Sequence, residues 1–247
     1  MLKGREQPMN VSLFITCLGD VFHADTGAHV VELLERLGCK VDFPRAQTCC
    51  GQPAFNSGYH KEAVEAAKHM MEAFEHSEYV VGISGSCVYM VHEYEKLFDE
   101  GSEWRKRAVT LKQKTFELTQ FIVDILGVED VGAEYHGTAT YHTSCHMTRL
   151  LGVKDAPMKL LNNVKGLTLV DLPNRSDCCG FGGTFAVKMN DISKQMVDEK
   201  VHHIKQTEAE ILIGADSSCL MNIGGRLSRE ELPVKVKHIA EILNARG

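Results

Sequence analysis

The chain has 247 residues, of which 44% are hydrophobic, and a formal net charge of −6 at pH 7. This composition predicts an ordinary globular protein, and the charge argues against a nucleic-acid partner, which would need clustered Lys and Arg. The N-terminal stretch MLKGREQPMN has no apolar signal-peptide core and no run reaches the length of a membrane span, so we expect a cytoplasmic protein without a membrane span.

The predicted elements of the first half alternate between strands and helices. Short β-rich apolar runs predict three strands, at 11–16, 40–43 and 79–84. Between them, apolar residues at helical spacing predict one helix that ends at Gly38 and a second helix over 60–77. The order of elements is therefore β-α-β-α-β.

The second half repeats this order after a connection over 104–126 that we predict to be helical. Its three strands are expected at 139–144, 167–172 and 210–215. Short strands that alternate with helices predict a parallel sheet. We expect an α/β protein of two tandem pseudo-symmetric repeats, each a small Rossmann-like parallel sheet with helices on both faces. The expected parts are a first repeat over 10–103, a helical connection over 104–137 and a second repeat over 138–247.

Eight of the nine cysteines follow one pattern in both halves. The motif TCCGQP in the first half has a counterpart, DCCGFG, in the second. The two sets are Cys17, Cys49, Cys50 and Cys87, and Cys145, Cys178, Cys179 and Cys219. Each member of the second set follows its counterpart by 128 to 132 positions, which indicates an internal repeat. The remaining Cys39 is expected to be a core residue.

Each cysteine group comes directly after a predicted strand. Because the carboxyl ends of parallel strands meet at one edge of a sheet, we expect the four thiols of each half to converge there. Two adjacent cysteines cannot both face the core from a strand, so each pair belongs in a turn, where Gly51 or Gly180 lets the backbone bend.

Four converging thiols match the ligands of a four-iron, four-sulfur cluster. Zinc accepts the same set, which leaves a zinc-stabilised interaction module as an alternative. A thiol-redox protein that uses the adjacent pair is a further alternative, disfavoured because neighbouring cysteines form only a strained disulfide. No dinucleotide, Walker, GxSxG or HExxH motif is present, and the catalytic residues stay unknown.

Histidines and cations also lie near the cysteines. His142 and His146 flank Cys145, but their counterparts near Cys17 are taken to be Leu13 and Leu18, so the repeat favours structural roles over ligation. Four cations are candidates to offset the charge of a thiolate-bound cluster. They are Arg45, Arg149, Arg175 and Lys188.

Each half contains a single Cys, then a CCG and then a final Cys. This repeated pattern resembles the cysteine-rich CCG-domain family of iron–sulfur oxidoreductase subunits. The resemblance extends to the stretches VSLFITCLGD, TCCGQPAFNSGY and CCGFGGTFAVKM. Within that family the chain is most similar to members that serve lactate utilization. The resemblance implies one or two 4Fe–4S clusters on the eight cysteines, with zinc as a substitute. It also implies an electron-carrying role in a three-component oxidation of L-lactate to pyruvate, with the B and C proteins of that system as partners.

The family pattern ends each half in CxxC, and the chain departs from it. Ser84 and Asp216 stand where that pattern has its first cysteine. A conventional cluster with four thiol ligands therefore suits the sequence better than one with five. Whether the chain alone acts as an enzyme is left open by the resemblance.

Overall fold

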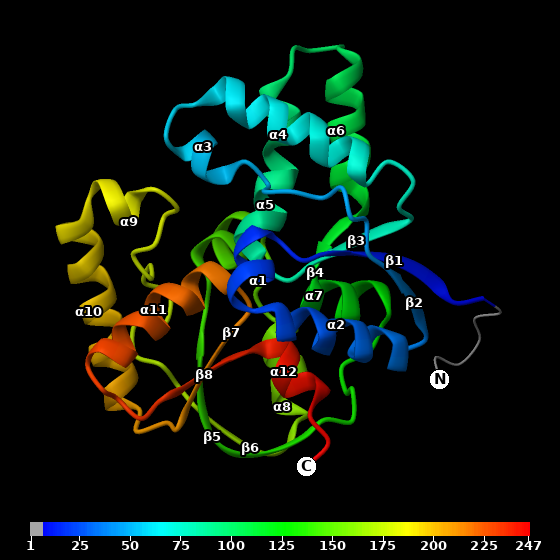
Figure 1. The fold of residues 1–247 in the computed structure, drawn as a ribbon. Helices are drawn as coiled ribbons and strands as arrows, with labels where there is room; N and C mark the ends of the chain where they lie inside the picture. Colours follow the sequence, from blue (N-terminus) through cyan, green and yellow to red (C-terminus); the bar gives the residue numbers. More distant parts are fainter. Residues whose placement is uncertain (1–6) are drawn as a thin grey trace.

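Within residues 7–247, the part of the chain that the computed structural model describes, two parallel four-stranded sheets organise the fold (Figure 1). Most of the N-terminal stretch considered above for a signal peptide lies outside the described residues. The strand orders are β2-β1-β3-β4 and β6-β5-β7-β8. The predicted α/β architecture of two pseudo-symmetric repeats is confirmed. Among the described helices, none combines the length and the apolar character needed to span a bilayer.

The strands are short and have matching registers in the two halves. The first sheet contains β1 (Met9–Phe14), β2 (Cys39–Asp42), β3 (Tyr79–Gly82) and β4 (Thr115–Glu117). The second contains β5 (Glu134–His142), β6 (Lys165–Val170), β7 (Ile211–Gly214) and β8 (Lys235–His238). Phe14 pairs with Gly82, and His142 pairs with Gly214. His142 therefore corresponds to Phe14, and the assignment of Leu13 as its counterpart is wrong by one residue, which in a strand means the opposite face.

The connection over 104–126 is not one helix. It consists of α6 (Glu103–Lys114), strand β4, α7 (Leu118–Gln120) and the π-helical turn η2 (Phe121–Ile125). Strand β4 pairs with β3, Val80 lying opposite Thr115, so this segment satisfies its backbone groups in the sheet. Pairing with the rest of the fold here outweighs the helical spacing of the apolar residues.

The remaining helices cover the sheets. Those of the first half are α1 (Cys17–Phe22), α2 (Ala24–Arg36), α3 (Gln52–Asn56), α4 (His60–Ala73), α5 (Gly85–Glu93) and the 3₁₀ turn η1 (Tyr94–Leu97). Those of the second half are the π-helical turn η3 (His146–Leu150), α8 (Ala156–Asn162), α9 (Phe185–Lys188), α10 (Asn190–Gln206), α11 (Ser217–Arg229) and α12 (Ile239–Asn244). Helices α4 and α6 lie at the top of the view beyond the first sheet, and α10 and α11 lie at its left (Figure 1).

The largest hydrophobic core takes its residues from both halves. Leu13 and Leu34 of the first half belong to the same buried cluster as Ile213 and Leu243 of the second. Helices α2 and α12 contact each other within it (Figure 1), and Arg36 Nη1 donates a 2.5 Å hydrogen bond to Asn244 Oδ1. The opposite faces of the sheets have separate cores, one under α4 and α6 and the other under α10 and α11. The two repeats are therefore joined through one shared hydrophobic layer.

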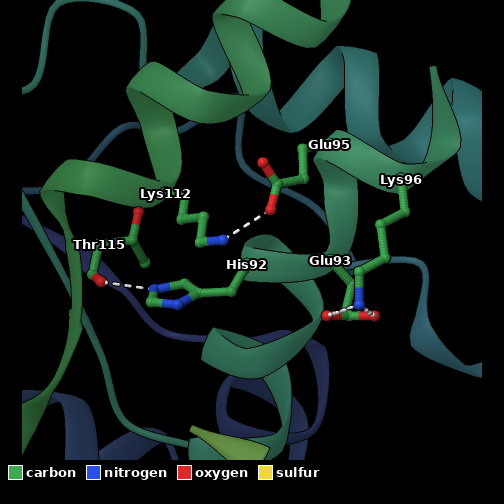
Figure 2. Close-up of polar contacts among 6 residues, drawn as sticks. All are labelled: His92, Glu93, Glu95, Lys96, Lys112 and Thr115. Carbon is green, nitrogen blue, oxygen red and sulfur yellow. Dashed lines mark hydrogen bonds and ion pairs between the residues drawn. The ribbon is translucent and has the colours of Figure 1, made fainter. Parts of the chain in front are cut away.

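Polar contacts join the C-terminal end of α5 to β4 and the turn η1 to α6 (Figure 2). His92 Nε2 lies 2.9 Å from the Thr115 carbonyl oxygen, and Lys112 Nζ lies 2.6 Å from Glu95 Oε1. Burial lowers the pKa of His92, so the neutral ring donates its N–H to that carbonyl. These contacts hold α5 in a fixed position beside the last strand of its sheet.

Candidate metal centres

The strand order creates a crevice at the carboxyl edge of each sheet. In the first sheet the chain passes from β1 to β2 on one side and then to β3 on the other. The connections that follow β1 and β3 therefore leave toward opposite faces, and ligands of open α/β folds bind at such a switch point. Cys17 begins the helix after β1, and Cys87 lies in the first turn of the helix after β3.

The four first-half thiols converge at this edge and are called here the first site. Cys17 Sγ lies 3.5 Å from Cys49 Sγ. The buried Cys50 thiol interacts with the thiols of Cys49 and Cys87. The first site thus unites side chains from three separate segments, as the sequence spacing predicts.

The second site repeats this arrangement with Cys145, Cys178, Cys179 and Cys219. Cys145 interacts with Cys178, and Cys179 Sγ lies 3.2 Å from Cys219 Sγ. Cys219 occupies the first turn of α11, as Cys87 does in α5. The ninth cysteine, Cys39, packs in the shared core, as expected.

Both CCG pairs lie in turns that a glycine makes possible. Gly51 and Gly180 each have φ +84°, a conformation that L residues rarely adopt. Each turn is also held from a distant helix. The buried Tyr94 hydroxyl donates to the Cys50 carbonyl at 2.8 Å, and the Asn222 amide donates to the Cys179 carbonyl at the same distance.

The first cysteine of each CCG pair has the character of a thiolate. Hydrogen bonds from the thiols of Cys17 and Cys50 hold the pKa of Cys49 well below its ordinary value. The equivalent bonds from Cys145 and Cys179 lower the pKa of Cys178. The thiolate is the form of cysteine that binds metals, so each site contains a ready anionic donor among three further thiols.

Asp216, at the position where the family pattern has a cysteine, connects the two halves. Its buried carboxylate accepts hydrogen bonds from the Ser86 backbone N–H at 2.7 Å and from the Ser144 hydroxyl at 3.3 Å. It also caps α11 by accepting from the backbone N–H groups of Ser218 and Cys219. Burial acts to raise the pKa of Asp216, but the hydrogen bonds from Ser218 and Ser86 hold it below its ordinary value. Asp216 is therefore a structural carboxylate whose oxygens are already occupied.

The two sites differ in enclosure. The first opens into a surface depression of about 280 Å³, lined by Cys17 and Cys49 together with Arg45, Val21 and Phe43. The second surrounds a cavity of only about 40 Å³ at the junction of the two halves. The walls of this cavity include Gln52, Asn56 and Ser86 of the first half as well as Cys145, Cys178 and Cys179.

Of the cations predicted from the sequence, Arg45 lines a cavity beside a cysteine site. Arg149 donates to the Ser176 carbonyl oxygen, Arg175 is exposed, and Lys188 lies over the Tyr59 ring. The buried cation near the second site is Lys200, which sequence analysis missed. Its Nζ donates to the Asn174 carbonyl at 2.8 Å, and its charge interacts with Cys179, Cys178 and Cys219.

His142 lies against the second site. One of its ring nitrogens and the Sγ atoms of Cys179 and Cys219 all lie within 4.8 Å of one another. Burial lowers its pKa to about 4, the positive charge of Lys200 acting in the same direction. The ring is therefore neutral, the state in which imidazole binds metals. The other flanking histidine, His146, has Nδ1 3.5 Å from Cys145 Sγ and packs beside the Tyr89 ring.

Comparison with known proteins agrees with this architecture. The model of the CCG family, described as a cysteine-rich domain, matches residues 11–92 and again residues 139–224. The chain is 66% identical over 238 residues to lactate utilization protein A of Geobacillus sp. (strain WCH70), covering 96% of this chain and 100% of the relative. It is 65% identical over 238 residues, with the same coverage, to lactate utilization protein A of Anoxybacillus flavithermus (strain DSM 21510 / WK1).

A solved structure shares the fold at much lower sequence similarity. The crystal structure of a hypothetical protein from Helicobacter pylori matches 98% of this chain with a TM-score of 0.66 and 10% identity, and this chain spans 50% of that one. That similarity concerns the fold alone. The two matches to the cysteine-rich domain and the near-full-length identity of the bacterial relatives establish the family: the chain belongs to the lactate utilization protein A family of CCG-domain proteins.

Proposed function

We propose that this chain is an iron–sulfur electron-transfer subunit of a multi-component system that oxidises L-lactate to pyruvate. The first site (Cys17, Cys49, Cys50 and Cys87) and the second site (Cys145, Cys178, Cys179 and Cys219) would each hold one 4Fe–4S cluster. The observation that carries the proposal is the convergence of four thiols at the same place in both sheets. Four thiolates are the donor set that such a cluster requires.

The surroundings of the thiols fit an anionic group. The Gly180 backbone N–H points at Cys178 Sγ from 3.4 Å, and hydrogen bonds to cluster sulfurs tune the reduction potential. Lys200 places a positive charge beside the second site, and Arg45 lines the depression over the first. When bound, a cluster supplies one-electron transfer, so two sites accommodate the two electrons that lactate releases on conversion to pyruvate.

The role in lactate oxidation rests on the family. The proteins with 65–66% identity carry the name lactate utilization protein A, and the letter indicates other components, for which we propose the B and C proteins as partners. The first site suits such contacts, because Val21 and Phe43 beside it are 70% and 47% exposed. Exposed apolar side chains gathered in one place are typical of interaction surfaces.

A zinc-stabilised interaction module is the second candidate, and one observation favours it. The approach of His142 to Cys179 and Cys219 forms a mixed nitrogen and sulfur set that suits zinc. Metal analysis separates the two candidates. Chain that is rich in zinc and takes up no iron after anaerobic reconstitution with iron and sulfide would favour the module.

The test of the proposed function is anaerobic purification followed by iron and sulfide quantification and electron paramagnetic resonance (EPR) of the reduced protein. Replacing Cys49 and Cys50 together by Ser is expected to abolish the first-site signal and spare the second. Replacing Cys178 and Cys179 together is the matched variant and should do the reverse. Iron content equal to that of the wild type in both double variants would show that the ligand assignment is wrong.

A further inference from the structure

The two sites differ in one buried position that the repeat makes directly comparable. His142 lies on the face of β5 that is directed toward the second site. The residue at the equivalent position of β1 is Phe14. Phe14 is fully buried in an apolar cluster with Cys50 and packs edge-on against the Phe74 ring, the two ring centroids being 5.8 Å apart. A phenyl ring has no polar atom, so it is buried in this apolar environment without leaving a hydrogen-bonding group unpaired.

His142 brings two polar nitrogen atoms to that place and leaves both without a partner. The side chain is 1% exposed, and neither Nδ1 nor Nε2 has a hydrogen-bond partner within the described residues 7–247. A buried polar atom without a partner destabilises the folded state, because it has lost its hydrogen bonds to water. By contrast, buried His238 uses both ring nitrogens, one toward the Ile83 carbonyl and one toward the Ala240 N–H.

The ring nitrogen is also in range of the sulfur atoms that we propose as ligands. Because it and the Sγ atoms of Cys179 and Cys219 lie within 4.8 Å of one another, a metal centre bound at these thiols is within reach of the imidazole. Asp216, the nearby carboxylate, already accepts several hydrogen bonds. We propose that the imidazole of His142 is a direct metal ligand of the second site, where it takes the place of one of the four thiolates. This site would then bind iron through nitrogen as well as sulfur, whereas the first site binds it through sulfur alone.

This inference rests on the proposed function and concerns the chemistry of one site. A neutral imidazole in place of an anionic thiolate raises the reduction potential of an iron–sulfur centre. The two centres of the chain would therefore accept electrons at different potentials, the second site being reduced more easily. The pseudo-symmetric fold would in this way hold two unlike centres.

The test uses the full-length chain with Cys49 and Cys50 replaced by Ser, so that iron occupies the second site alone. The protein is labelled with ¹⁵N in the imidazole ring of histidine, reconstituted anaerobically with iron and sulfide, reduced and studied by pulsed EPR. A strong coupling between a ring nitrogen and the electron spin is expected. The change His142→Phe, which installs the residue of the first half, should abolish the coupling and speed the loss of iron to a chelator about tenfold.

Two further variants complete the test. His146→Phe removes the other histidine beside the second site and is expected to preserve the coupling. His142→Cys supplies a thiolate instead and should retain iron while the nitrogen coupling disappears and the reduction potential falls. Absence of ring-nitrogen coupling in the parent protein, or its persistence in His142→Phe, would overturn the inference while the proposed function stands. Failure of both sites to take up iron would overturn the proposed function itself.

Discussion

Glu117 and His238 occupy the same place in the two halves, at the last residue of β4 and of β8. Both side chains are buried, and each caps the helix that follows it. Glu117 accepts a hydrogen bond from the Thr119 N–H at 2.8 Å, and His238 accepts one from the Ala240 N–H at 3.1 Å. Burial raises the pKa of Glu117 to about 7 and lowers that of His238 to about 4. At this position the fold therefore favours the neutral form of an acid and of a base.

The raised pKa of Glu117 predicts a pH-dependent loss of stability. Between pH 4.5 and pH 7 the folded chain retains a proton on Glu117 that the unfolded chain releases, so this contribution to stability is lost as the pH rises. Glu117→Gln mimics the protonated acid and should raise the free energy of unfolding by about 3 kcal/mol at pH 8 and by little at pH 4.5. Urea denaturation of the metal-free chain at both pH values measures the difference.

Glu129→Gln is the control for that experiment, because the Glu129 side chain is 56% exposed and its carboxylate pairs with Lys159 at the surface. Its effect should stay below about 1 kcal/mol at either pH. An equal gain for Glu117→Gln at pH 4.5 and pH 8 would contradict the proposed proton retention.

At the scale of elements, the N-terminus of α5 meets η3 of the other half at very short range. A Cβ atom on Gly85 would lie 2.5 Å from Met147 Cβ, closer than two such atoms approach, and the Gly85 N–H donates to the Ala215 carbonyl. The absence of a side chain at Gly85 is therefore a condition for the junction of the halves, and α5, which carries Cys87, is positioned by it.

Gly85→Ala should destabilise the chain by about 1–3 kcal/mol through overpacking. Gly225→Ala in α11 is the matched variant, because a Cβ there meets nothing within 4 Å and the residue is helical. It should stabilise the chain by about 0.5–1 kcal/mol. Thermal unfolding of both variants in parallel checks the pair; equal effects would show that the close approach to Met147 has no energetic role.

The elements differ in how well the sequence predicts them. The runs that became β1, β3 and β7 are recognisable because they are mostly apolar and buried. Strand β4, by contrast, has three residues that include a buried Glu117. Strand β8, KVKH, has two lysines in four residues and resembles a loop. Their identity as strands comes from pairing with β3 and β7, which local sequence does not encode.

The same distinction applies within the sites. Spacing and repetition predicted which eight thiols converge, because the topology of a parallel sheet determines where strand ends meet. The sequence did not predict a role for Lys200, because it lies in α10 among polar residues, where a lysine side chain normally faces water. The relation of His142 to Phe14 depends on strand register, and an error of one residue concealed it.

At the scale of the whole molecule, the shared core makes each half dependent on the other. Leu13, Leu34, Ile213 and Leu243 belong to one buried cluster, so separating the halves exposes a broad apolar face to water. Residues 1–137 expressed alone are therefore expected to show no cooperative urea transition, whereas the full chain should unfold in a single step. A sharp transition and well-dispersed amide resonances for the isolated half would contradict this expectation.

The unequal enclosure of the two sites has a consequence for handling the protein. Cys87 is half-buried, whereas its counterpart Cys219 is 5% exposed, and dioxygen or an alkylating reagent reaches the open depression before the small cavity between the halves. Iodoacetamide followed by mass mapping should therefore modify Cys87 earlier than its counterpart Cys219. With the proposed clusters bound, material purified aerobically would retain the inner centre after the outer one has decayed, and its iron stoichiometry would imitate that of a protein built to hold a single centre.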